Sequence, residues 1–284
     1  MPEAALPIVD AHHHFWHYRA EEYPWISDAM ASLRRNFLPA DLEREFAAGG
    51  VSGAVTVQAR QSLVETEWLL SLAEAHSFLR GVVGWVPLTD VNAEGHLQRF
   101  AAHPKLKGVR HLLQDEPDER YFLRPDFLAG IALLQRHKLV YDILVFERHL
   151  PQTIEFVDRF PDQIFVLDHI AKPRIREGFL SPWRENIREL SRRPNVYCKL
   201  SGMATEADLQ NWTSDSLRPY FNVVLEAFTP SRLMFGSDWP VLLAVCDYGR
   251  WLETVKAWIA PLSSTERGRI LAGTAREAYR LQGA

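Results

Sequence analysis

The 284 residues comprise 47% hydrophobic and 24% charged side chains, the composition of an ordinary globular protein with a sizeable core. The formal net charge of −4 and the isoelectric point of about 6.3 argue against a nucleic acid or an anionic membrane as partner, since either favours a basic surface. The two cysteines, Cys198 and Cys246, form no Cys-x-x-Cys pair, which argues against a secreted disulfide scaffold and favours a reducing cytoplasm.

Targeting and membrane signals are also missing from the sequence. The first residues have neither the basic start nor the apolar run of a signal peptide, and nowhere do 18 apolar residues follow one another. We therefore expect a cytoplasmic protein that acts on a small molecule, without a membrane or nucleic-acid partner. The sequence leaves both a monomer and a homodimer open.

Short β-rich runs alternate with longer segments of helical periodicity. Strands are expected at 8–14, 53–60, 81–88, 107–113, 139–146, 164–170, 195–201 and 233–238. Helices are expected at 39–48, 65–78, 92–103, 126–137, 151–160, 182–192, 217–228 and 248–259, with a last one at 264–281 closing the bottom or the side. Eight strands suit a closed parallel barrel, and no Gly/Ser-rich linker divides the chain. We therefore predict an α/β fold, a (β/α)₈ barrel, in a single domain over residues 1–284.

The connection after the first strand, residues 15–38, is long and rich in aromatic residues. It carries Phe15, Trp16, Tyr18, Tyr23, Trp25 and Phe37. Loops at the carboxyl ends of barrel strands build active sites, so this loop is a candidate substrate wall. Capping of the barrel core is the alternative, and both interpretations can hold together.

The first strand ends in three consecutive histidines. Because side chains alternate along a strand, His12 and His14 share one face and His13 takes the other. Two imidazoles on one face can chelate a divalent metal or bracket one substrate oxygen. A polar surface strand or a tag remnant is the alternative, but the histidines follow a buried-looking Ile-Val pair.

Two further candidates end the last and the sixth strands. Asp238 follows the last strand, and closure of a barrel makes that strand a neighbour of the first, so Asp238 is expected beside His12 and His14. Its carboxylate can accept a proton from water or ligate a metal, or it can cap the next helix. His169 ends the sixth strand, and alternation turns the preceding Asp168 away from it, where Asp168 can orient a neighbour.

These segments together resemble a known family. Residues 9–16 (Val-Asp-Ala-His-His-His-Phe-Trp), 167–173 (Leu-Asp-His-Ile-Ala-Lys-Pro), 198–202 (Cys-Lys-Leu-Ser-Gly) and 235–240 (Phe-Gly-Ser-Asp-Trp-Pro) are similar to motifs of the amidohydrolase superfamily. The resemblance is narrower to its sugar-lactonase branch, which includes L-fuconolactonases and L-rhamnonolactonases. Segments 22–26, 57–60, 108–116, 141–148 and 201–208 match that branch as well, so the resemblance covers nearly the whole chain.

The resemblance implies a metal site and a reaction. His12 and His14 match the first-strand metal-binding pair of the family, His169 the sixth-strand histidine and Asp238 the last-strand aspartate. The fifth strand offers neither His nor Lys, and the fourth offers only Lys107 at its start, so the full ligand pattern is incomplete. A divalent metal, Zn²⁺ first among them, is expected on these four residues, with a metal-free mechanism as the alternative.

The implied reaction is the opening of a sugar lactone, an aldonolactone such as L-fuconolactone, to the sugar acid. In this hypothesis Asp238 takes the proton from water, and His12 and His14 polarise the carbonyl directly or through the metal. His169 holds the carbonyl or the leaving oxygen. Polar and aromatic side chains at other strand ends are candidates for substrate binding: Trp25, Gln58, Arg60, Arg110, His111, Gln114 and Lys199. Alternation puts Arg110 and Gln114 on one face and His111 on the other, and does not decide which face is inside.

Three alternatives change the chemistry. An anionic lactone, of the muconolactone or pyrone type, needs several cations in the mouth of the barrel, and Arg60, Arg110, Lys172 and Arg174 can supply them. A metal-dependent decarboxylase of aromatic acids would keep the fold, but such relatives use the fifth-strand histidine that is missing here. A non-catalytic barrel is the third alternative, because fold does not dictate function.

Overall fold

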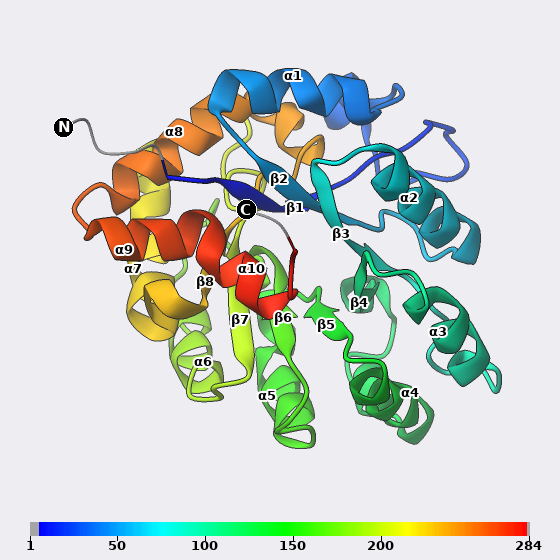
Figure 1. Ribbon diagram of the computed structural model, residues 1–284. Coiled ribbons are helices and arrows are strands. Elements are labelled where there is room, and N and C mark those ends of the chain that lie inside the picture. Colours follow the sequence, from blue (N-terminus) through cyan, green and yellow to red (C-terminus); the bar gives the residue numbers. More distant parts are fainter. Residues whose placement is uncertain (1–5, 283–284) are drawn as a thin grey trace.

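The computed structural model describes residues 6–282, which fold into a barrel of eight parallel strands in the order β1 to β8 (Figure 1). The strands are β1 (Val9–His13), β2 (Gly53–Val57), β3 (Leu79–Gly84), β4 (Leu106–His111), β5 (Val140–Ile143), β6 (Phe165–Leu167), β7 (Val196–Leu200) and β8 (Leu233–Phe235). The predicted (β/α)₈ fold is thereby confirmed. Several strands end earlier than expected, because their last residues leave the sheet to form loops at its carboxyl end.

Helices fill the predicted connections and surround the barrel (Figure 1). They are α1 (Pro39–Gly49), α2 (Leu63–Ala75), α3 (Ala93–Ala101), α4 (Pro125–Arg136), α5 (Leu150–Asp158), α6 (Trp183–Leu190), α7 (Ser214–Arg232), α8 (Tyr248–Ile259), α9 (Ser264–Gly268) and α10 (Thr274–Ala278). Over residues 6–282, no helix combines the length and apolar character needed to cross a bilayer.

The barrel closes between the segments that follow β8 and the end of β1. The backbone N–H of Asp238 donates to the carbonyl of His12 at 2.8 Å, and that of His14 donates to the carbonyl of Trp239 at 2.7 Å. His13 and Trp239 form a parallel bridge at the same place. The expected neighbourhood of the first and last strands is therefore present, and it carries residue 238 to the end of β1.

The last helix departs from the prediction. Instead of one helix over 264–281, a π-helical turn at Arg269–Gly273 separates α9 from α10. Such a turn carries an extra residue and changes which face of the helix points inward. Ala275 and Tyr279 consequently pack against the apolar strand residues of the barrel interior, among them Val9 and Val140. In Figure 1, α10 lies across the near end of the barrel and covers it.

Most aromatic side chains of the loop 15–38 are buried against the barrel. Phe15, Trp16 and Phe37 are fully buried and Tyr23 nearly so, whereas Trp25 is 42% exposed. An antiparallel bridge between Trp16 and Phe37 ties the two ends of the loop together. The loop therefore caps the barrel core, and Trp25 alone of these five aromatics lies on a cavity at the barrel mouth.

Beside that mouth, α2 carries a buried acid, Glu65. Its Oε2 accepts hydrogen bonds from the backbone N–H groups of Ala59 at 3.1 Å and Arg60 at 2.8 Å, just after β2. Burial nevertheless raises the pKa of Glu65 from 4.5 to about 7, against the opposing effect of these hydrogen bonds and of Arg60. Glu65 therefore holds the loop after β2 in place, but burying its carboxylate lowers the free energy of unfolding once the carboxyl is ionised.

The Glu65→Gln variant is expected to lose part of the pH dependence of stability. Because the pKa of Glu65 is higher in the folded than in the unfolded chain, its stabilising contribution is present below about pH 4.5 and is lost as the pH rises through about 7. The shift corresponds to about 3 kcal/mol in the free energy of unfolding. Urea denaturation of both proteins at pH 5, 6.5 and 8 measures the difference. Parallel profiles for the two proteins would contradict the assignment.

Candidate active site

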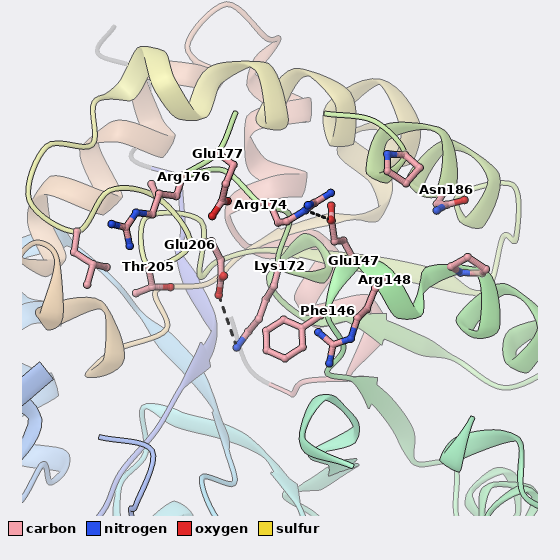
Figure 2. A pocket seen from close by; sticks show the side chains of 14 residues that line it. Phe146, Glu147, Arg148, Lys172, Arg174, Arg176, Glu177, Asn186, Thr205 and Glu206 are labelled. Atoms are coloured by element: carbon pink, nitrogen blue, oxygen red, sulfur yellow. Dashed lines mark hydrogen bonds and ion pairs between the residues drawn. The ribbon is translucent and has the colours of Figure 1, made fainter. Parts of the chain in front are cut away.

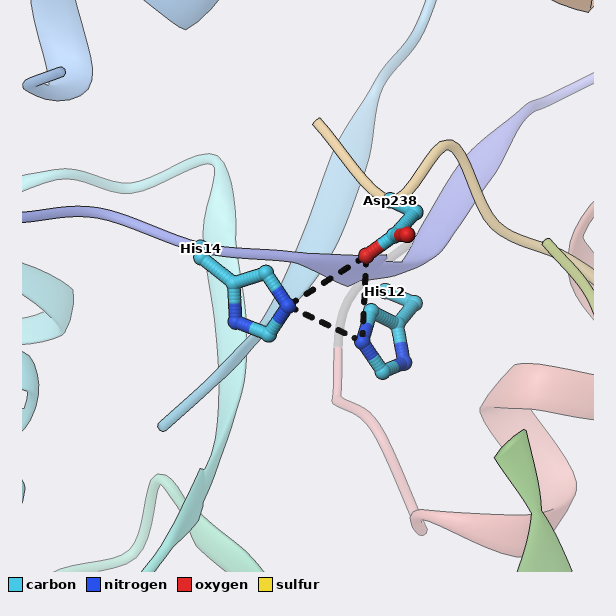
Figure 3. Close-up of side chains that lie close together, drawn as sticks. All are labelled: His12, His14 and Asp238. Atoms are coloured by element: carbon cyan, nitrogen blue, oxygen red, sulfur yellow. Dashed lines mark hydrogen bonds and ion pairs between the residues drawn. The ribbon is translucent and has the colours of Figure 1, made fainter. Parts of the chain in front are cut away.

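Three imidazoles and one carboxylate meet at the carboxyl end of the barrel. The Nε2 atoms of His12 and His14 lie 3.2 Å apart. The Oδ1 of Asp238 lies 3.4 Å from Nε2 of His14, 3.7 Å from Nε2 of His12 and 3.9 Å from Nε2 of His169. All four residues are at most 5% exposed. Figure 3 shows the His12, His14 and Asp238 side chains converging from the ends of the first and last strands.

An irregularity in β1 turns the two histidines inward. The register against β2 shifts between Asp10 and His13. The carboxylate of Asp10 holds this shift, because its Oδ1 accepts from the backbone N–H of His12 at 3.1 Å and from that of Ser237 at 2.9 Å. His13 takes the opposite face, as predicted, and its ring packs against Phe15.

The hydrogen bonding of His14 fixes the nitrogen that it offers to the site. Its Nδ1 lies 2.8 Å from the carbonyl oxygen of Val57, which can only accept a hydrogen bond. The proton must therefore sit on Nδ1, and Nε2 presents a lone pair toward His12 and Asp238. A backbone carbonyl behind a ring nitrogen is the usual way in which a protein orients a metal-binding or proton-accepting histidine.

A left-handed turn after β6 corrects the expected orientation of Asp168. Alternation predicts that Asp168 and His169 face opposite ways, but both enter the interior, with Asp168 Oδ1 3.3 Å from Nδ1 of His12. The chain leaves the extended conformation after Leu167, and residues 169–172 all have positive φ, between 46° and 61°. Four non-glycine residues in this region are strained, so the surrounding structure must hold them there.

Three neighbours hold this turn. Ser201 places its Oγ 2.9 Å from Nδ1 of His169, and the indole N–H of Trp183 donates to the carbonyl of Ile170 at 2.8 Å. Gly202 has φ +64° and lies directly against the imidazole, so that a Cβ there would sit 2.6 Å from Nδ1 of His169. Only glycine fits both this conformation and this contact.

Below the histidines lies a charged network with no solvent exposure at its centre. Lys199 Nζ lies 2.5 Å from Oδ2 of Asp142, 2.9 Å from Oδ1 of Asp168 and 3.1 Å from Nδ1 of His12. The hydroxyl of Tyr279 donates to Asp142 at 2.9 Å. The network joins the helix that closes the barrel bottom to the histidines at its top.

Sequence reasoning did not identify Asp142 as part of this site, although a signal was present. The aspartate interrupts the apolar run 139–146, just as a lysine interrupts the buried strand β7. Isolated charges of opposite sign in buried strands predict an ion pair, because an unpaired charge is too costly to bury. The strand register further places Asp142 opposite Arg110.

The protonation states suit general-base chemistry. Burial acts to raise the pKa of Asp238, but the neighbouring His169, His14 and Lys172 outweigh it, so the pKa of Asp238 lies below its usual value. Burial lowers the pKa of His169 to about 4, and it holds the pKa of His12 well below its usual value. At neutral pH the site therefore holds an ionised carboxylate, and the imidazoles of His12 and His169 are uncharged.

A cavity of about 160 Å³ opens onto this cluster. Three of the predicted substrate-binding residues line it, Trp25, Arg110 and Gln114, together with His14, His169 and Asp238. The Oε1 of Gln114 is buried and has no hydrogen-bond partner among residues 6–282. The inner face of β4 is therefore the one that carries Arg110, which settles the parity that alternation leaves open.

The other four predicted substrate-binding residues do not line the cavity. Gln58 and Lys199 are fully buried, and each contacts a charged neighbour. The guanidinium of Arg110 donates a hydrogen bond to the backbone carbonyl of Gln58 at 2.5 Å. Arg60 turns outward to Glu22, with an N–O distance of 2.7 Å. His111 lies on the outer face of β4 and pairs with Glu116 at 2.6 Å.

The donor set fits a divalent metal. One ligand atom each from His12, His14 and Asp238 lie within 4.8 Å of one another, and a second such group combines His12, Asp168 and His169. The first group fits better, because Nε2 of His14 is unprotonated and Asp238 is ionised. Asp168 already pairs with Lys199 and with Arg110, at 2.9 Å each.

Known proteins match this chain over nearly its full length. A family model described as Amidohydrolase matches residues 9–281. The chain is 42% identical to an L-fucono-1,5-lactonase of Burkholderia multivorans over 286 aligned residues, covering 96% of each chain. It is 38% identical to an L-fucono-1,5-lactonase of Burkholderia ambifaria, over 96% of this chain and 95% of that one.

A crystal structure agrees with these similarities. An amidohydrolase from Burkholderia multivorans, crystallised with bound zinc, superposes with a TM-score of 0.93 at 41% identity, covering 98% of this chain and 100% of that one. Fold, motifs and sequence similarity thus agree over the whole barrel. The chain belongs to the amidohydrolase family, as the resemblance of its motifs predicts.

Proposed function

We propose that this chain is a lactonase that opens the neutral lactone of a sugar acid, with L-fucono-1,5-lactone as the first candidate. The observation that carries the proposal is the Asp238 carboxylate, 3.4 Å from Nε2 of His14 and 3.7 Å from Nε2 of His12, at the wall of a small cavity. The identity of 42% and 38% to two L-fucono-1,5-lactonases supports the substrate class.

In the proposed mechanism, Asp238 is the general base. With its pKa held below 3.8, the carboxylate is ionised at neutral pH and can take a proton from a water molecule that attacks the lactone carbonyl. The ring C–O bond then breaks, and the proton passes from Asp238 to the leaving alkoxide. His169, 3.9 Å from the carboxylate, holds the carbonyl or the leaving oxygen by a hydrogen bond.

A divalent metal would be held by His12, His14 and Asp238. When bound, it would polarise the carbonyl and the attacking water as a Lewis acid. Zinc bound to the Burkholderia multivorans relative supports Zn²⁺ as the ion. Without it, Nε2 of His14 has no proton to donate, so the hydrogen bond to the carbonyl oxygen would come from His12 or His169.

The charges around the cavity favour a neutral substrate over an anionic one. Arg110 and Lys172 are the cations that line it, and Asp115 and Asp238 are carboxylates on the same wall. Arg110 already pairs with buried Asp168 at 2.9 Å, and this carboxylate largely neutralises the charge that a substrate carboxylate would need. Hydroxyl groups of a sugar ring instead fit the free Oε1 of Gln114, and the ring itself fits the exposed face of Trp25.

A pH-indicator assay of purified protein tests the proposal. L-fucono-1,5-lactone is compared with muconolactone and 2-pyrone-4,6-dicarboxylate, each with a chelator and with added Zn²⁺. We expect a kcat/KM above about 10⁴ M⁻¹s⁻¹ for the sugar lactone, within the usual range for enzymes, and values at least about 100-fold lower for the two anions. No acceleration of sugar-lactone opening, with or without Zn²⁺, would refute it.

A further inference from the structure

A second, larger cavity of about 710 Å³ lies beside the catalytic cavity, at the same end of the barrel. It is formed by the loops that follow β5, β6 and β7 and by the start of α6 (Figure 2). Its charged lining residues are Glu147, Arg148, Lys172, Arg174, Arg176, Glu177 and Glu206. Lys172 also lines the catalytic cavity, so one ammonium group belongs to both spaces.

Cations outnumber carboxylates in this second cavity, and their pairing is uneven. Arg174 is paired with Glu147 at 2.5 Å, and Arg148 with Glu119 at 3.1 Å. Within residues 6–282, the guanidinium of Arg176 has no hydrogen bond or ion pair, although Asp208 is near enough to feel its charge. Figure 2 shows Arg176 on one side of the cavity with Lys172 below it.

The pairing of Lys172 is loose and easily exchanged. Its Nζ lies 3.9 Å from Oε1 of Glu206, beyond hydrogen-bond distance, and also stands 5.5 Å from the centre of the Phe146 ring. Lys172 ends the left-handed turn that begins at His169, so its backbone is held in place. Its ammonium group can still take a new partner. An incoming anion competes with a long ion pair of low energy, and it also meets the negative charges of Glu177 and Glu206 in the same lining.

We propose that this second cavity binds the carboxylate of the ring-opened sugar acid, through Lys172 and Arg176. The inference rests on the proposed lactonase function. Hydrolysis converts a neutral ring into an anion, which the carboxylate of Asp238 then repels. Lys172 is the cation that both cavities share, and Arg176 is the cation beyond it whose charge is not already committed.

The proposal predicts that the product inhibits by binding in the second cavity as well as in the lactone site. Initial rates of L-fucono-1,5-lactone hydrolysis are measured at increasing L-fuconate, together with calorimetric titration of L-fuconate into the protein. We expect mixed inhibition for the unchanged protein. In Arg176→Gln the affinity for L-fuconate falls about tenfold, as expected for the loss of one charge-assisted hydrogen bond, while kcat/KM for the lactone stays within about twofold.

Arg159→Gln is the matched control. It removes an exposed arginine just after α5 that is paired with Glu155 and does not line the cavity, so L-fuconate affinity should not change. Purely competitive inhibition, or equal L-fuconate affinity in the unchanged and Arg176→Gln proteins, overturns the proposal. Failure of the lactonase function shows separately, as absent turnover, and the calorimetric comparison still decides whether the cavity binds the acid.

Discussion

Asp238→Asn is expected to lower kcat for lactone opening by about 10³-fold while the protein stays folded. The amide has nearly the shape of the carboxylate but cannot take a proton from water. Residue 238 has φ +60°, a conformation that asparagine tolerates as well as aspartate does, so the backbone should not relax. Steady-state kinetics by pH indicator and thermal unfolding of the same preparation measure the two halves of the prediction.

An exposed acid on another loop provides the control for this variant. Asp162→Asn removes the same charge from a solvent-exposed position before β6, where no catalytic effect is expected. If Asp238→Asn keeps more than about a tenth of the activity, Asp238 is not the general base. A large loss of thermal stability in the variant would instead show that the carboxylate holds the fold together.

Lys199→Met is expected to lower the free energy of unfolding by about 3–5 kcal/mol, the usual effect of removing one partner from a buried ion pair. The side chain has no solvent exposure and contacts the carboxylates of both Asp142 and Asp168. Methionine fills a similar volume but leaves Asp142 without a cation and Asp168 with Arg110 as its remaining cation. Chemical denaturation at pH 7.5 measures the loss.

Two further variants serve as controls: one breaks an exposed ion pair elsewhere, and the other removes a charge from the buried network. Lys256→Met breaks an exposed pair with Glu253 and should cost less than about 1 kcal/mol. Adding Asp142→Asn to Lys199→Met removes one of the stranded charges and should recover part of the lost stability. A loss below about 1 kcal/mol for Lys199→Met alone would mean that the network does not stabilise the barrel.

The sequence predicts the barrel because its strands are short apolar runs separated by helical periodicity. It predicts the position of Asp238 for a topological reason, since closing eight strands must bring the last beside the first. These features depend on patterns that extend over the whole chain, and local irregularities do not disturb them.

Local departures from regular geometry are what the sequence does not reveal. Asp168 faces inward because the chain turns left-handed at His169, and nothing in an Asp-His-Ile-Ala-Lys segment announces four non-glycine residues with positive φ. The register shift at Asp10 has the same effect in β1. Its place after a strand makes Arg60 a candidate for substrate binding, but Arg60 pairs with Glu22 and does not line the cavity.

The second cavity lies beyond sequence reasoning for a different reason. Its lining comes from three connections that are separate in the chain, and Arg176 has meaning only next to Lys172 and the loop around residue 206. In the sequence, nothing distinguishes Arg176 from an ordinary solvated arginine. Only the shared position of Lys172 between two cavities suggests a path for an anion.

The most direct measurement of the central claim is a single turnover in H₂¹⁸O, with the enzyme in excess over L-fucono-1,5-lactone. If Asp238 activates water for attack on the carbonyl, the acid formed in the first turnover carries one ¹⁸O in its carboxylate and Asp238 stays unlabelled. An unlabelled first product with ¹⁸O recovered in Asp238 would mean that the carboxylate itself attacks the ring, and the absence of any acid would contradict the lactonase assignment altogether.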